Sequence, residues 1–176
     1  MEKDFFNYIV QTLANFVVIA TFVYFLIDRR SNKKLKKNKE TYELCNKFQQ
    51  QVIPHFFRVF DMNSNLDINI IKKITYDKAT GDFHLPKLKN QAEYMSFINE
   101  VLFLFNEMDE FAKRLQDNRV DIGLAYKLQG NTFCEIISSF KHLYDLYVEL
   151  DEAAYKDLDK LYKLWKYNLQ WETERQ

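Results

Sequence analysis

Residues 91–116 read QAEYMSFINEVLFLFNEMDEFAKRLQ, and this stretch decides the fold class. It contains no Gly or Pro, and its centre, residues 101–105 (VLFLF), is apolar on every side of a helix. A helix that is apolar all round belongs in the middle of a core. The whole chain of 176 residues has only three Gly and two Pro, which disfavours strands joined by tight turns. We therefore predict an all-α domain built around this helix.

Helical periodicity continues on both sides of this stretch, with apolar residues three or four positions apart. The other expected elements are a helix at 41–60 kinked at Pro54, a short helix at 66–74, an irregular loop at 76–86, helical runs at 122–128 and 132–150 interrupted near Gly130, and a last helix at 152–171. These elements predict four or five helices packed up and down in one domain, residues 41–176.

The N-terminal segment has the composition of a membrane span. Residues 5–27 carry no charge, and at about 1.5 Å per residue they reach about 34 Å, enough for a hydrocarbon core of about 30 Å. A cleaved signal peptide is disfavoured, because two acidic residues flank Lys3 and no small-residue cleavage site follows the apolar run. We predict a single transmembrane helix within residues 1–28.

A dense cationic run, residues 29–40, follows this span on one side only. The positive-inside rule then places the domain at 41–176 in the cytoplasm and the N-terminus outside a bacterial inner membrane. Topology and attraction to anionic lipid explain the run, while binding to RNA or a protein partner stays open. The candidate lipid or partner contacts are Arg29, Arg30, Lys33, Lys34, Lys36 and Lys37.

A polar stripe lies within the predicted span. Asn7, Gln11 and Asn15 recur every four residues and so share one helix face, which Val18 and Phe22 continue. Amides facing lipid are unfavourable, whereas another helix or a water-filled lumen satisfies them. The stripe predicts self-association, either through hydrogen bonds between helices in a small bundle or around a pore with an apolar constriction. A chance arrangement near the membrane interface is the remaining alternative.

The sequence contains no recognisable catalytic motif. No Gly-rich phosphate loop is present, the two cysteines fit buried thiols, and His55, His84 and His142 lie too far apart to predict a metal site. An Arg followed after four to six residues by His, the pattern of metal-free RNA cleavage in HEPN domains, is absent, although Arg114 or Arg119 approaching His142 through space stays open. We expect no catalytic residue, metal or cofactor, and therefore a protein that is not an enzyme.

The last predicted helix is rich in aromatic residues on its apolar face. Tyr155, Tyr162 and Trp165 are candidates for a contact between copies of the chain, and they would look identical in the sequence if they filled the core. The net charge of zero gives no electrostatic reason to expect tight nucleic-acid binding by the chain as a whole.

The layout of one span, a basic run and a helical domain resembles the small membrane-anchored accessory proteins encoded beside the RNA-guided, RNA-cutting nuclease of type VI-B CRISPR systems. The resemblance covers the whole chain in architecture and length and rests on no sequence motif. It implies a divergent HEPN-like fold and an antiviral accessory that oligomerises, as a ring, into an inner-membrane pore. Depolarisation of the cell would follow when the nuclease is activated by target RNA.

The chain lacks the Arg-to-His pattern of catalytic HEPN domains. This absence puts an RNase function in doubt and leaves the pore function that the resemblance implies unaffected. Two other functions stay open. One is a membrane-tethered helical adaptor that binds a cytoplasmic protein, and the other is a membrane-anchored HEPN-like ribonuclease.

Overall fold

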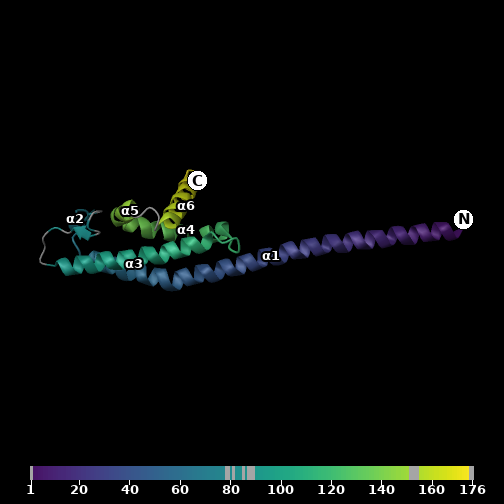
Figure 1. Cartoon of the computed structure of the whole chain (residues 1–176), viewed down its shortest axis with the longest axis horizontal. Coiled ribbons are helices and arrows are strands. Elements are labelled where there is room, and N and C mark those ends of the chain that lie inside the picture. Colours follow the sequence, from purple (N-terminus) through teal and green to yellow (C-terminus); the bar gives the residue numbers. More distant parts are fainter. Residues whose placement is uncertain are drawn as a thin grey trace. The chain divides into compact units, whose positions relative to one another are not determined.

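The computed structural model confirms the all-α class (Figure 1). It describes residues 2–77, 80, 82–84, 86, 90–150 and 155–174, and within these the side chains of all but 2–18, 20, 68, 82 and 150. The elements of the described part are α1 (Glu2–Ser64), α2 (Ile68–Ile71), β1 (Thr75–Asp77), β2 (Asp82–His84), α3 (Gln91–Leu115), α4 (Ile122–Ser139), α5 (Lys141–Leu150) and α6 (Lys156–Thr173).

The chain divides into two compact units, Met1–Lys39 and Glu40–Gln176. The first unit contains only the beginning of α1. The second contains the rest of α1 and every other described element, and the boundary falls at the end of the cationic run predicted at 29–40.

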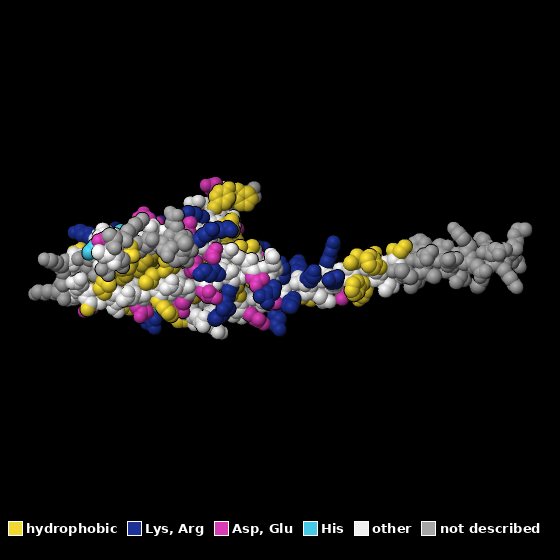
Figure 2. Space-filling model, viewed as in Figure 1, with side chains coloured by type: hydrophobic (Ala, Val, Ile, Leu, Met, Phe, Trp, Pro, Cys, Tyr) yellow, Lys and Arg dark blue, Asp and Glu magenta, His cyan; other side chains and the backbone are white. Residues whose placement is uncertain are grey.

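The described side chains of the first unit are exposed, except Asn38, which is half-buried. Ile19 and the unbroken run of large apolar residues 22–27 are exposed, and within it Phe22 is 61% and Tyr24 is 72% exposed. Figure 2 shows these hydrophobic side chains next to a run of Lys and Arg along the helix. Among the residues whose side chains are described, no helix has an apolar stretch long enough to cross a membrane. For most residues of the predicted transmembrane stretch, the structure does not describe the side chains.

The core of the second unit is built around α3, which lies against α4, α5 and α6. In the apolar centre of α3, Val101, Leu104 and Phe105 are buried as predicted, whereas Leu102 is half-buried and Phe103 is 56% exposed. Phe105 meets the edges of Tyr144 and Tyr147 on α5, with ring centroids 5.8 and 5.7 Å away. Trp165 of α6 lies 5.1 Å from the ring of Phe133 on α4.

One buried carboxylate fixes the beginning of α6. Asp109 on α3 is 4% exposed, and its Oδ1 accepts a hydrogen bond of 3.0 Å from the backbone N–H of Leu158. Its Oδ2 pairs with Lys113 at 2.7 Å, and this pairing raises the pKa of Lys113. Because Tyr155, the residue before α6, offers no side-chain cap, Asp109 satisfies a free N–H of the helix from another element.

The predicted break near Gly130 was wrong, since α4 continues through this residue and ends at Ser139. Gly130 serves close packing: a Cβ there would lie 2.5 Å from Cδ2 of Tyr126, so only glycine leaves room for this ring. The actual break is at Phe140, which has φ −117° and ψ 30° and is buried against Phe56 and Phe97.

The predicted loop at 76–86 contains a short antiparallel hairpin, in which Tyr76 pairs with Phe83. Phe83 also meets Tyr147 edge-on at 5.5 Å, so the hairpin is attached to the core by an aromatic contact. Lone strand pairs are marginal by themselves, and this contact supplies the support that the backbone pairing lacks.

Candidate functional site in the groove between α1 and α3

A groove with an apolar floor lies between α1 and α3 in the second unit. Its volume is about 260 Å³. The lining residues are Leu44, Lys47, Phe48, Gln51 and Val52 from α1, and Asn106, Glu107, Glu110, Phe111 and Arg114 from α3. On each helix the lining residues are separated by alternating steps of one and three positions, so each helix presents one face to the groove.

The floor is formed by side chains that also belong to the core. Phe48 and Phe111 have ring centroids 4.5 Å apart and are 2% and 4% exposed, and Val52 is 3% exposed. They are held in place by packing from below, through the contacts of Phe48 and Phe111 with Phe133. The floor is therefore rigid, and it offers apolar surface to a ligand without any rearrangement.

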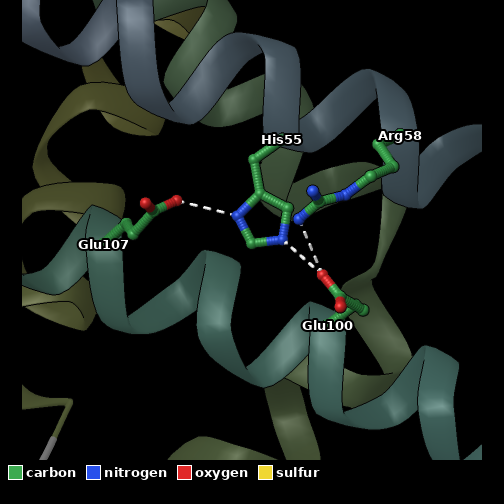
Figure 3. Close-up of polar contacts among 4 residues, drawn as sticks. All are labelled: His55, Arg58, Glu100 and Glu107. Atoms are coloured by element: carbon green, nitrogen blue, oxygen red, sulfur yellow. Dashed lines mark hydrogen bonds and ion pairs between the residues drawn. The ribbon is translucent and has the colours of Figure 1, made fainter.

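A polar cluster of four residues continues the same two helix faces beyond the groove (Figure 3). His55 on α1 points between two glutamates of α3: Nδ1 lies 2.8 Å from Oε2 of Glu107 and Nε2 lies 3.0 Å from Oε2 of Glu100. Arg58 donates from Nη2 to the same Oε2 of Glu100 at 2.9 Å. His55 is 6% exposed, and its ring centroid is 5.2 Å from that of Phe103.

This cluster holds α1 and α3 together and does not have the form of a catalytic centre. Both nitrogens of His55 can donate to the carboxylates at once only when the ring carries two protons. With both nitrogens engaged and the ring buried, His55 has no free atom to present to a substrate. Its role is to join α1 to α3 through its contacts with Glu107 and Glu100.

The opposite end of the groove carries charges of both signs. Lys47 and Arg114 line it, and Arg114 donates from Nε to Oε1 of Glu110 at 3.0 Å. A second, more polar hollow of about 400 Å³ adjoins this end and includes Arg119. Arg119 pairs with Asp117 at 2.8 Å, which lowers the pKa of Asp117. Each end of the groove thus combines basic and acidic side chains, with Glu107 at the end near His55.

The predicted membrane residues fall partly outside the described side chains. Asn7, Gln11, Asn15 and Val18 lie in α1, but their side chains are outside the description, whereas Phe22 is exposed. All six predicted lipid or partner contacts are exposed: Arg29, Arg30, Lys33, Lys34, Lys36 and Lys37.

The aromatic candidates for a contact between copies are core residues. Tyr155, Tyr162 and Trp165 are 8%, 4% and 1% exposed, and the hydroxyl of Tyr155 donates to Oδ1 of Asn106 at 2.9 Å. Since they face the core of their own chain, they leave no surface for the contact that the sequence predicted there.

The open possibility of an Arg approaching His142 finds no support in the described side chains. His142 lies with Nε2 3.2 Å from the carbonyl oxygen of Ile74, while Arg114 and Arg119 pair with carboxylates of their own neighbourhoods. Among the described side chains, His55 and Arg58 come together by sharing Oε2 of Glu100, in the reverse order along the chain. Within the described part, no three His, Cys, Asp or Glu side chains gather as a metal site would require.

Sequence reasoning did not find the groove. The available signal was the spacing of Lys47, Gln51, His55 and Arg58, which are polar residues on one face of this helix. No protein-family model, curated protein or solved structure matches the chain. Fold and groove define it only as a helical domain with a groove on its surface, in a chain whose first helix exposes apolar and cationic residues in succession before that domain.

Proposed function

We propose that this protein is a membrane-anchored, non-enzymatic effector that self-associates and permeabilises a bacterial inner membrane. The observation that carries the proposal is the exposure of consecutive large apolar side chains immediately before a cationic run. These apolar residues are Ile19, Phe22, Val23, Tyr24, Phe25, Leu26 and Ile27. Apolar surface of this extent needs a cover, and hydrocarbon followed by anionic headgroups matches the order of apolar and basic residues.

Self-association is supported by the sequence of the same helix. The amides of Asn7, Gln11 and Asn15 share one face and need polar partners within a membrane. A ring of such helices would place the amides around a lumen, and the apolar residues Val18 and Phe22 would narrow it. The resemblance to accessory proteins of type VI-B CRISPR systems adds the trigger, which is the activation of an RNA-guided nuclease by target RNA.

The test is the membrane potential of bacterial cells, measured with a voltage-sensitive dye, with and without the nuclease and a matching target RNA. We expect depolarisation only when all components are present. The triple variant N7L/Q11L/N15L should abolish it at equal expression, because the amides that line the lumen are gone. The control Thr12→Leu changes a polar residue off that face and should depolarise normally. Depolarisation by the triple variant would refute the pore.

A second function is favoured by one observation, the groove between α1 and α3. A membrane-tethered adaptor would use this surface to bind a cytoplasmic protein, and its N-terminal helix would act only as an anchor. In that case the membrane potential would stay unchanged under every condition above. The nuclease would co-purify with the full chain and be lost on substitution of exposed groove residues such as Gln51.

A further inference from the structure

The outward side of α6 carries a stripe of three large apolar side chains. Leu164, Tyr167 and Trp171 are 47%, 67% and 48% exposed, and their spacings of three and four place them on one side of the helix. The opposite side, which includes Trp165, is buried in the core. In Figure 1 α6 rises from α3 and α4 towards the C-terminus, and Figure 2 shows hydrophobic side chains standing out at this end. The stripe is therefore a ridge on the surface of the domain.

Lysines precede the stripe on the same side of α6. Lys156 and Lys160 are exposed and continue the stripe by steps of four towards the beginning of the helix. Lys163 is exposed as well and pairs with Asp159 at 2.6 Å. Large apolar and aromatic side chains together with lysines are the composition of helices that lie in the interface of a bilayer. There the rings sit at the level of the headgroups, and the ammonium groups are attracted to anionic lipid.

The acidic side chains of α6 leave this side positively charged. Asp157 and Asp159 are half-buried and accept hydrogen bonds from other elements. Glu172 lies near Tyr126 of α4, where burial and then this carboxylate raise the pKa of Tyr126. Glu174 lies on the side of the stripe, but beyond the end of α6. The side of α6 that carries the stripe is therefore cationic before the stripe and acidic only after the helix has ended.

We propose that this side of α6 docks on an anionic lipid surface, with the rings of Tyr167 and Trp171 among the headgroups and Lys156 and Lys160 against lipid phosphates. A bilayer accepts a ridge without a complementary cavity. A stable protein interface, by contrast, uses about 20–30 residues on each side, many more than this stripe offers. Leu164 favours hydrocarbon over single-stranded nucleic acid, because an aliphatic side chain offers no ring on which a base can stack.

The inference rests on the membrane location that the proposed function gives the chain. When α1 holds the chain at a bilayer, α6 meets the lipid at a high effective concentration, so a contact that is weak by itself becomes populated. The docked helix is a second attachment of the same chain to the membrane, in addition to α1. The membrane potential tests the pore, whereas the lipid contact of α6 is measured separately, so the two can fail independently.

The two tryptophans of the chain supply the measurement. Trp165 is 1% exposed in the core, whereas Trp171 is 48% exposed on the stripe. The full-length chain is reconstituted into vesicles of phosphatidylcholine and phosphatidylglycerol whose acyl chains carry bromine, which quenches tryptophan fluorescence only at short range. We expect the fluorescence to be lower than in the same vesicles without bromine, because Trp171 contacts the lipid. The variant Trp171→Phe should lose this quenching.

Two variants separate the charges from the apolar stripe. K156Q/K160Q should shift the equilibrium from docked to undocked α6 by at least about tenfold and so reduce the quenching. L164Q/Y167Q should abolish it, because the apolar surface that enters the lipid is gone. The control Leu128→Gln changes an exposed apolar residue of α4 and should leave the quenching unchanged. Each variant keeps both tryptophans and changes only exposed side chains, so its circular dichroism should match that of the natural chain.

Equal fluorescence of the natural chain in vesicles with and without bromine would overturn the docking. So would quenching that is equally strong in vesicles of phosphatidylcholine alone, because the lysines would then select no anionic lipid. If quenching is absent and L164Q/Y167Q lowers the mass of the chain in detergent, measured by light scattering, the stripe is a contact between copies. If quenching is absent and polyuridylate shifts the emission of Trp171, the stripe binds nucleic acid.

Discussion

His55 illustrates how one side chain can join two helices distant in the sequence. Replacing it by Leu leaves the carboxylates of Glu100 and Glu107 without their shared donor at a partly buried place. We expect the free energy of unfolding to fall by about 1–3 kcal/mol in urea titrations. The control His84→Gln changes an exposed histidine and should stay within about 0.5 kcal/mol of the natural chain. An unchanged stability of His55→Leu would show that these contacts contribute nothing.

The two thiols predict a pH dependence. Burial raises the pKa of Cys45 and of Cys134 from 9.0 to about 11. Each thiol therefore keeps its proton in the folded chain at a pH where the unfolded chain has lost it. This contribution to stability is complete below pH 9 and is lost as the pH rises toward about 11.

Urea unfolding measured between pH 8 and about pH 10.5 should show this loss. Burial also raises the pKa of Tyr144 and of Tyr147, which acts in the same direction. The double variant C45A/C134A should lose part of the alkaline decline and keep the part due to the tyrosines. An identical decline in both proteins would contradict the assignment to the thiols.

At the scale of elements, long periodic segments could be predicted and local exceptions could not. The helix expected at 91–116 is α3, Gln91–Leu115, because its apolar residues leave no other choice. The helix expected at 152–171 is α6, Lys156–Thr173. The break was placed at Gly130 because glycine usually interrupts helices, but here the ring of Tyr126 needs the space that a side chain would fill.

The two glycines of α4 give a matched pair of substitutions. Gly130→Ala should lower the free energy of unfolding by about 1–2 kcal/mol, because overpacking against Tyr126 exceeds the gain of about 1 kcal/mol in helix propensity. Gly123→Ala meets only Oδ1 of Asp121 at 3.4 Å and should be neutral or stabilising by up to about 1 kcal/mol. Thermal or urea unfolding measures both, and a stabilised Gly130→Ala would contradict the packing role.

The attachment of α6 to α3 depends on Asp109. Asp109→Ala removes the acceptor of the Leu158 N–H and the partner of Lys113, so we expect a loss of about 2–3 kcal/mol. Asp109→Asn keeps an acceptor for the N–H and should lose less than the alanine variant. Hydrogen exchange of the amides at the beginning of α6 should be fastest in Asp109→Ala, slower in Asp109→Asn and slowest in the natural chain. Equal protection in all three would show that packing alone holds the helix.

At the scale of the whole molecule, the surface organisation depends on how helices are rotated against each other. Each helix containing the groove residues could be recognised separately, but the groove exists only because the faces with Gln51 and Glu107 meet. A sequence without an alignment does not give that rotation. The same limit applies to the aromatic residues of α6. Periodicity identified the stripe that would be buried, but it did not show whether the core of the same chain or a second copy buries it.

The cationic run makes a prediction about topology. Replacing Arg29, Arg30, Lys33, Lys34, Lys36 and Lys37 by Gln, with Glu2 and Asp4 changed to Lys, reverses the charge difference across the proposed span. By the positive-inside rule we expect a mixed or inverted orientation, measured by the fluorescence of green fluorescent protein fused to the C-terminus. The control K156Q/K160Q/K163Q lies too far from the span to act. Full fluorescence of the charge-reversed chain would contradict the topology.

The pairing of α1 with α3 also has a consequence for synthesis. His55 and its neighbours on α1 are made first, while their partner Glu107 follows 52 residues later. At about 5–20 residues per second, the apolar side of this part of α1 stays uncovered for roughly 3–10 seconds on the ribosome. The nascent chain is therefore open to aggregation and to chaperone capture in this interval, before the groove has its second wall.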